Sequence, residues 1–103
     1  MHMRIVWGRV KPGKWEEYEE TYRRVLDPAH AEIEGLRGRW LVRDISDPDS
    51  GYSVSLWDSL EAMAKYETTP LFREKVLPAL QPFFANEFTT KRCVVKVKQE
   101  FAT

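Results

Sequence analysis

The chain is poor in the residues that most often carry chemistry or cross-links. Its 103 residues include one cysteine, Cys93, and two histidines, His2 and His30. One cysteine cannot form an intrachain disulfide, and a metal site would have to rest mostly on carboxylates. Cys93 lies in an apolar run, so we expect a buried small hydrophobe rather than a reactive thiol. We therefore expect no metal and a cytoplasmic location.

Long apolar runs and net charge are also missing. The longest runs, such as residues 83–85, are too short for a transmembrane helix or a signal sequence. Sixteen Lys and Arg balance sixteen Asp and Glu, whereas proteins that bind nucleic acids or anionic membranes usually carry a basic excess. We expect neither partner. The length predicts one domain, residues 1–103, whose first two residues resemble a cloning remnant.

What is present is a regular succession of short amphipathic segments. Runs rich in β-branched and large residues predict strands over 3–10, 38–45, 52–57 and 88–101. Apolar residues at helical spacing predict a helix over 14–26, with Trp15 in the core. Asp58 or Ser59 is expected to cap a second helix that runs to about Thr68, and Pro70 opens a further helical piece.

This order, β-α-β-β-α-β, is typical of an α+β ferredoxin-like fold, in which helices cover one face of an antiparallel sheet. The strands over 3–10 and 38–45 are partly apolar on both sides. A sheet that is apolar on both faces predicts a second sheet stacked against it, and hence a homodimer. The long last strand is expected to reach the edge of the partner's sheet.

Four short stretches carry a family resemblance. Residues 51–67 (GYSVSLWDSLEAMAKYE) hold a strand that ends in Trp57 and passes straight into a helix, and residues 10–14 form a strand–helix turn. Residues 33–36 lead into the second strand, and Arg43 and Asp44 precede a hairpin loop rich in Asp and Pro. In this order the stretches resemble the antibiotic biosynthesis monooxygenase (ABM) family.

The resemblance implies a dimeric α/β barrel with a pocket between the sheet and the helices of each protomer. It also implies one of several activities: cofactor-independent oxygenation of polyketide-derived phenols, quinol oxidation or haem degradation. The haem-degrading branch uses an Asn on the first strand and a His on the helix after the tryptophan. This chain has neither and matches only Trp57, so we expect no haem and no other cofactor.

Two residues are the catalytic candidates, Trp57 and His30. Side chains alternate between the two faces of a strand. If Tyr52 and the residues that share its face pack on the helices, Trp57 lies on the opposite face, in the space between the two sheets. Its ring would then stack on a planar substrate, and its N–H would bond a carbonyl; the alternative is a core residue at a strand–helix corner. His30 is the one plausible base at neutral pH; the alternative is an exposed loop histidine.

Seven further residues are predicted to line the substrate pocket: Trp7, Arg39, Trp40, Arg43, Ser55, Tyr66 and Phe72. Ser55 stands where many family members carry a glutamate. The arginines would hold a phenolate or carboxylate and lower the pKa of a phenol; the alternative for them is pairing with nearby carboxylates at the dimer rim. The aromatic residues would otherwise be ordinary core or dimer interface.

Two functions are therefore expected from the sequence. The first is a monooxygenase-like enzyme that oxidises a small aromatic or quinol-type compound with O2. The second is a non-catalytic dimeric barrel that binds a small hydrophobic ligand. A proton acceptor that shares one pocket with Trp57 would favour the enzyme.

Overall fold

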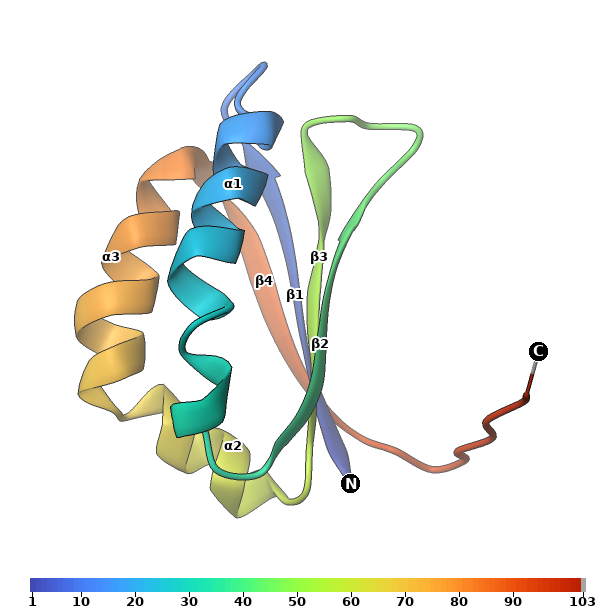
Figure 1. Cartoon of the computed structure of the whole chain (residues 1–103). Helices are drawn as coiled ribbons and strands as arrows, with labels where there is room; N and C mark the ends of the chain where they lie inside the picture. The colour runs from blue at the N-terminus through green and yellow to red at the C-terminus, as the bar shows by residue number, and fades with distance from the viewer. Residues whose placement is uncertain (103) are drawn as a thin grey trace.

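A computed structural model describes residues 1–102 and confirms the predicted order of elements (Figure 1). The strands are β1 (His2–Val10), β2 (Leu36–Arg43), β3 (Ser50–Trp57) and β4 (Phe84–Val94). The α-helices are α1 (Trp15–Leu26), α2 (Leu60–Glu67) and α3 (Leu77–Leu80). The 3-10 and π-helical turns are η1 (His30–Glu32), η2 (Leu71–Val76) and η3 (Gln81–Phe83).

The strands form one four-stranded antiparallel sheet in the order β2-β3-β1-β4. All the helices lie on one side of this sheet, and the other side is left open (Figure 1). This is the α+β ferredoxin-like fold that the sequence predicts. The helical connections join strands that are not neighbours in the sheet: α1 leads from β1 to β2, and the helical region from α2 to η3 leads from β3 to β4. Residues from distant parts of the chain therefore meet on the covered face.

The helices form where the sequence places an apolar stripe or a cap. In α1 the buried residues are Trp15, Tyr18, Tyr22 and Leu26, spaced so that they share one face. The helix α2 is capped by Ser59, whose Oγ accepts a hydrogen bond from the backbone N–H of Ala62 at 3.1 Å. Both observations confirm sequence predictions.

The second helical region is interrupted by a wide turn. Between α2 and α3, η2 is a π-helical turn that starts directly after Pro70, and α3 begins next to Pro78. Proline lacks a backbone N–H and fits only the first turn of a helix, so the two prolines set where the pieces start. The turn directs Phe72 and Val76 toward the sheet.

The last strand differs from its prediction over residues 88–101. It begins at Phe84, which pairs with Val10 across an irregularity in register, and it ends at Val94, which pairs with His2. One further backbone hydrogen bond follows β4: the N–H of Val95 donates to the carbonyl oxygen of Met1 at 2.9 Å. The following residues lead away from the sheet (Figure 1).

The open face of the sheet is apolar, as predicted. It carries Trp7 of β1 opposite Tyr52 of β3, and Trp40 of β2 opposite Val54 of β3. The side chain of Trp40 is 50% exposed, although tryptophan is normally a buried residue. Cys93 lies on the same face, opposite Met3, and is exposed. The prediction that Cys93 is buried is therefore wrong for the single chain, because no helix covers this side.

Within residues 1–102, no helix is long and apolar enough to cross a membrane.

Candidate functional site

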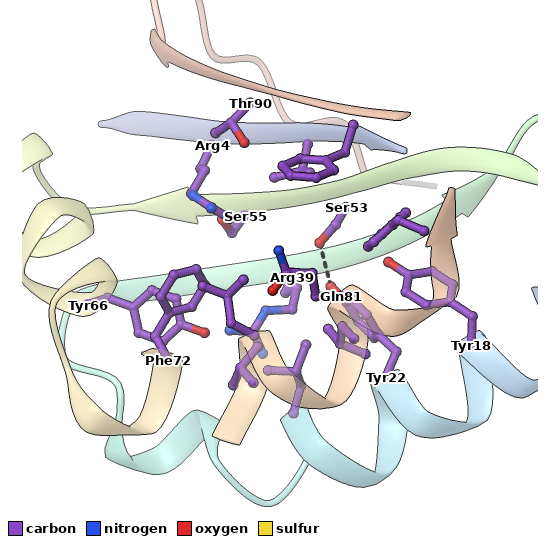
Figure 2. A pocket seen from close by; sticks show the side chains of 17 residues that line it. Arg4, Tyr18, Tyr22, Arg39, Ser53, Ser55, Tyr66, Phe72, Gln81 and Thr90 are labelled. Atoms are coloured by element: carbon purple, nitrogen blue, oxygen red, sulfur yellow. Dashed lines mark hydrogen bonds between the residues drawn. The ribbon is translucent and has the colours of Figure 1, made fainter. Parts of the chain in front are cut away.

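A cavity of about 130 Å³ lies between the covered face of the sheet and the helices. Figure 2 shows its lining, which comes from all four strands and from α1, α2, η2, α3 and η3. Its wall is mostly apolar and includes the rings of Phe72, Phe84 and Phe88. The polar side chains of the lining are Arg4, Tyr18, Tyr22, Arg39, Ser53, Ser55, Tyr66, Gln81 and Thr90. An apolar cavity with a few converging polar groups is the usual form of a small-molecule site.

The strand register places three arginines in one row across the covered face. Arg92 of β4 pairs with Arg4 of β1, Arg4 pairs with Ser55 of β3, and Ser55 pairs with Arg39 of β2. We call Arg92, Arg4, Ser55 and Arg39 the arginine row. Two of its arginines, Arg4 and Arg39, line the cavity on either side of Ser55. Together they give an apolar cavity a positive potential on its sheet wall.

The buried tyrosines of the cavity act as neutral hydrogen-bonding groups. The hydroxyl of Tyr22 bonds Ser53 Oγ at 2.7 Å. Burial raises the pKa of Tyr22 and of Tyr66 above the ordinary value of 10.0, an effect that the positive charges of Arg39 and Arg4 partly oppose. Tyr18 is also buried, and burial raises its pKa strongly. At neutral pH all three keep their protons, so they can donate hydrogen bonds but do not serve as bases.

Arg4 is held in a crowded position near α2. Its Nε lies 3.6 Å from Glu67 Oε2, and its guanidinium lies over the ring of Phe72, 5.3 Å from the centroid. Burial lowers the pKa of Arg4 and outweighs the attraction of Glu67, which raises it. The group remains charged at neutral pH because an arginine starts from a very high pKa.

Trp57 is placed differently from its prediction. It is 0% exposed, packs against Tyr66 at 5.2 Å between ring centroids, and donates its indole N–H to Ser55 Oγ at 2.8 Å. The helix-facing residues of β3 include Ser53, Ser55 and Trp57. Tyr52 and the residues that share its face of the strand therefore point to the open side. This is the reverse of the arrangement that would expose the ring of Trp57 between two sheets. Trp57 does not line the cavity; it holds Ser55.

Four of the predicted pocket residues meet at the cavity: Arg39, Ser55, Tyr66 and Phe72. The other three lie elsewhere. Trp7 and Trp40 project from the open face, on strands separated by β3. Arg43 lies at the end of β2, where it pairs with Glu16 at 3.1 Å. This pairing matches the alternative expected for the arginines.

His30 is exposed and begins the short turn η1. Its Nδ1 lies 2.7 Å from the carbonyl oxygen of Asp27. The ring borders a surface hollow of about 410 Å³, whose lining shares Tyr22, Leu26 and Arg39 with the cavity. His30 therefore lies outside the cavity. It borders a surface hollow that shares the lining residue Arg39 with the cavity.

Sequence reasoning missed Arg4 and Tyr22. Tyr22 belongs to the apolar stripe of its helix, and nothing in the spacing shows that its hydroxyl meets a serine. For Arg4 the signal is incomplete. Arg4 shares one side of the first strand with Val6, and a charged residue on the helix-facing side of a strand requires a partner or a ligand, but the sequence does not show which side faces the helices.

Within residues 1–102, no group of three or more His, Cys, Asp or Glu side chains is placed to hold a metal ion.

Comparison with known proteins gives a consistent result. The family model described as "Antibiotic biosynthesis monooxygenase" matches residues 1–76. A Bordetella bronchiseptica protein provisionally named an antibiotic biosynthesis monooxygenase has 20% identity and a TM-score of 0.82, with 93% of this chain and 97% of that chain covered. A similarly named Deinococcus radiodurans protein has 13% identity and a TM-score of 0.81, with 100% of both chains covered.

A conserved protein from Methanosarcina mazei Go1 has 18% identity and a TM-score of 0.77, with 93% of this chain and 94% of that chain covered. At such identities, these structures support the fold alone. No curated protein matches the chain.

Proposed function

The chain belongs to the antibiotic biosynthesis monooxygenase family, and we propose that it oxidises a small aromatic or quinol-type compound with O2 without a cofactor. The observation that carries this proposal is the arginine row in the wall of an aromatic cavity. Arg4 and Arg39 flank Ser55, and rings of phenylalanine and tyrosine form much of the remaining wall.

The cavity offers what such chemistry requires from a protein. A phenol or enol must lose a proton before it gives an electron to O2. A guanidinium beside a bound phenol lowers the phenol's pKa, and exclusion of water strengthens this effect. We assign the anion-holding role to Arg39, and the positioning of the ring to Tyr66 and Phe72. Trp57 acts indirectly, because it fixes the orientation of Ser55.

For a hydroxyanthrone, the proposed reaction balances with O2 as the oxidant. The methylene carbon loses its two hydrogens and becomes a carbonyl carbon that carries one oxygen atom. The second oxygen atom leaves with those hydrogens as water. We propose His30 as the group that accepts the first proton, by way of the hollow that adjoins the cavity at Arg39.

A second function, binding of a small hydrophobic ligand without turnover, is favoured by one observation. The tyrosines in the cavity keep their protons, and the imidazole of His30 is exposed. If His30 does not receive a proton from the substrate, the cavity contains no base and the protein is a binder.

The test is oxidation of a hydroxyanthrone and of a quinol by purified protein under O2, followed by the absorbance of the quinone. We expect the protein to form quinone faster than buffer alone does. When the hydroxyanthrone is the substrate and O2 is labelled, one labelled oxygen atom should appear in the quinone product. Arg39→Met should lower the rate about tenfold or more, whereas Arg43→Met, on the same strand and face but outside the cavity, should retain it. No acceleration across the panel would leave the binding function as the conclusion.

We also propose that the protein acts as a homodimer, as members of this family generally do. The surface that supports this is the open face, where Trp40, Val42 and Tyr52 are exposed. The segment after Val94 carries the exposed Val97 and Phe101, which would cover the edge of the partner's sheet.

A further inference from the structure

Charges near Arg4 do not balance. Two guanidiniums, those of Arg4 and Arg92, lie beside one carboxylate, that of Glu67. Arg92 takes both oxygens of that carboxylate: its Nε donates to Oε1 at 3.0 Å, and its Nη2 donates to Oε2. The 3.6 Å between Arg4 Nε and Glu67 Oε2 is longer than a hydrogen bond. Within residues 1–102, the contact of Arg4 with Glu67 is therefore electrostatic and is not closed by a hydrogen bond.

The Nε of Arg4 is buried and has no hydrogen-bond partner among residues 1–102. Only 17% of the Arg4 side chain is exposed. A buried donor without an acceptor is destabilising, and more so when it is charged. Burial also lowers the pKa of Arg4, which means that the surroundings compensate its charge incompletely. Such a position is stabilised by any anion that reaches it.

Arg4 lines the cavity, so an anion bound there would lie against its side chain. Figure 2 shows Arg4 extending from β1 beside Ser55, with Thr90 on the neighbouring strand. Ser55 Oγ already accepts the indole N–H of Trp57, so its own O–H remains available to donate. A guanidinium and a hydroxyl on adjacent strands form a pair of donors that suits the two oxygens of a carboxylate.

We infer that the ligand of this cavity is an aromatic acid whose carboxylate binds Arg4 and Ser55. The inference rests on the proposed use of the cavity as a substrate site, and it narrows the substrate class. The acid group lies at the β1 end of the arginine row, and the oxidisable ring lies toward Arg39 and the aromatic wall. The face of the Arg4 guanidinium is covered by Phe72, so the carboxylate approaches in the plane of the guanidinium, as a bidentate contact requires.

A matched pair of probes isolates the effect of the ligand's negative charge on binding. 2-Naphthoate and 2-naphthamide have nearly the same shape, and only the first carries a negative charge. Neither has a phenol, so binding is measured without oxidation. By calorimetric titration at pH 7, we expect wild-type protein to bind 2-naphthoate about tenfold or more tightly than 2-naphthamide, because a charged hydrogen bond contributes about 1.5–3 kcal/mol.

Three variants test whether Arg4 causes this preference. Arg4→Met should bind both probes equally. Glu67→Gln should bind 2-naphthoate more tightly than wild type does, because the competing carboxylate is removed from beside Arg4 and Arg92. Lys75→Met is the matched control: it removes one positive charge from an exposed position outside the cavity, and its preference should equal that of wild type.

Equal binding of the two probes by wild type, or a preference that survives in Arg4→Met, overturns the inference. If Arg4→Met does not fold, weaker binding of 2-naphthoate by Glu67→Gln overturns it instead. The result is independent of catalysis. If the protein prefers 2-naphthoate but oxidises no quinol, the proposed activity is rejected and the carboxylate site is kept. If it oxidises a quinol but binds both probes equally, the carboxylate site is rejected and the proposed activity is kept.

Discussion

Trp57 and Ser55, two residues apart on β3, are joined by a hydrogen bond of 2.8 Å from the indole N–H to the hydroxyl oxygen. The tryptophan is completely buried under α2, and the serine lines the cavity. The most buried aromatic side chain of the fold therefore sets the direction of a polar group in the candidate site.

Replacing Trp57 with Phe removes this donor and leaves unfilled volume beside Met63. We expect a loss of about 2 kcal/mol in the free energy of unfolding, from the hydrogen bond and the cavity together. Urea denaturation followed by circular dichroism measures it. In a double-mutant cycle with Ser55→Ala, the two costs should not add, because either change breaks the same bond. Strictly additive costs would contradict the coupling.

Tyr22 and Tyr18 form a natural comparison on one face of α1. Tyr22→Phe breaks the bond to Ser53 and should lower the free energy of unfolding by about 1 kcal/mol. Tyr18 is equally buried but has no hydrogen bond from its hydroxyl to another described residue, so Tyr18→Phe should change stability by less than about 0.5 kcal/mol. Thermal unfolding of both variants decides the matter, and equal losses would argue against the assigned role of the Tyr22 hydroxyl.

The carboxyl of Glu67 makes stability depend on pH. Its hydrogen bond from Arg92 holds its pKa below the ordinary value of 4.5. A carboxyl with a lowered pKa in the folded state stabilises the fold above its unfolded pKa, and the contribution is lost as the pH falls through the folded pKa. The stability advantage of wild type over Glu67→Gln should thus be full at pH 6 and shrink below about pH 4.5. An advantage that stays constant down to pH 3 would contradict the pairing.

The open face offers a test of assembly. Trp40→Asp places a charge in the centre of the apolar surface, and we expect it to convert the proposed dimer into a monomer, as measured by light scattering after size-exclusion chromatography. Leu60→Asp is the control, since Leu60 is also an exposed apolar residue but begins α2 on the other side of the sheet. A dimer that survives Trp40→Asp would place the interface elsewhere.

The sequence predicts the order and type of the elements well because each has a local cause. The apolar stripe of α1 and the Ser59 cap act over a few residues, so they can be seen without knowing the fold. The resemblance to the family also agrees with the match over residues 1–76. What local pattern does not contain is which face of a strand receives the helices.

This ambiguity explains the errors at the site. Alternation shows that Ser55 and Trp57 share a face, but β3 is apolar on both sides, so the pattern does not say which side is covered. The covered face, and with it the true position of Trp57, depends on packing against α2. The end of β4 differs from its prediction because residues 95–101 keep a strand-like alternation, whereas the last residue of β4 that pairs with β1 is Val94.

The π-helical turn η2 gives the cavity wall an evolutionary property. A π-helical turn holds about one residue more than an α-helical turn, so deleting a single codon there would restore regular α-helix while the flanking segments keep their mutual orientation. Phe72 and Val76 lie within this turn. A one-residue deletion can therefore reshape this part of the cavity wall while every strand stays in register.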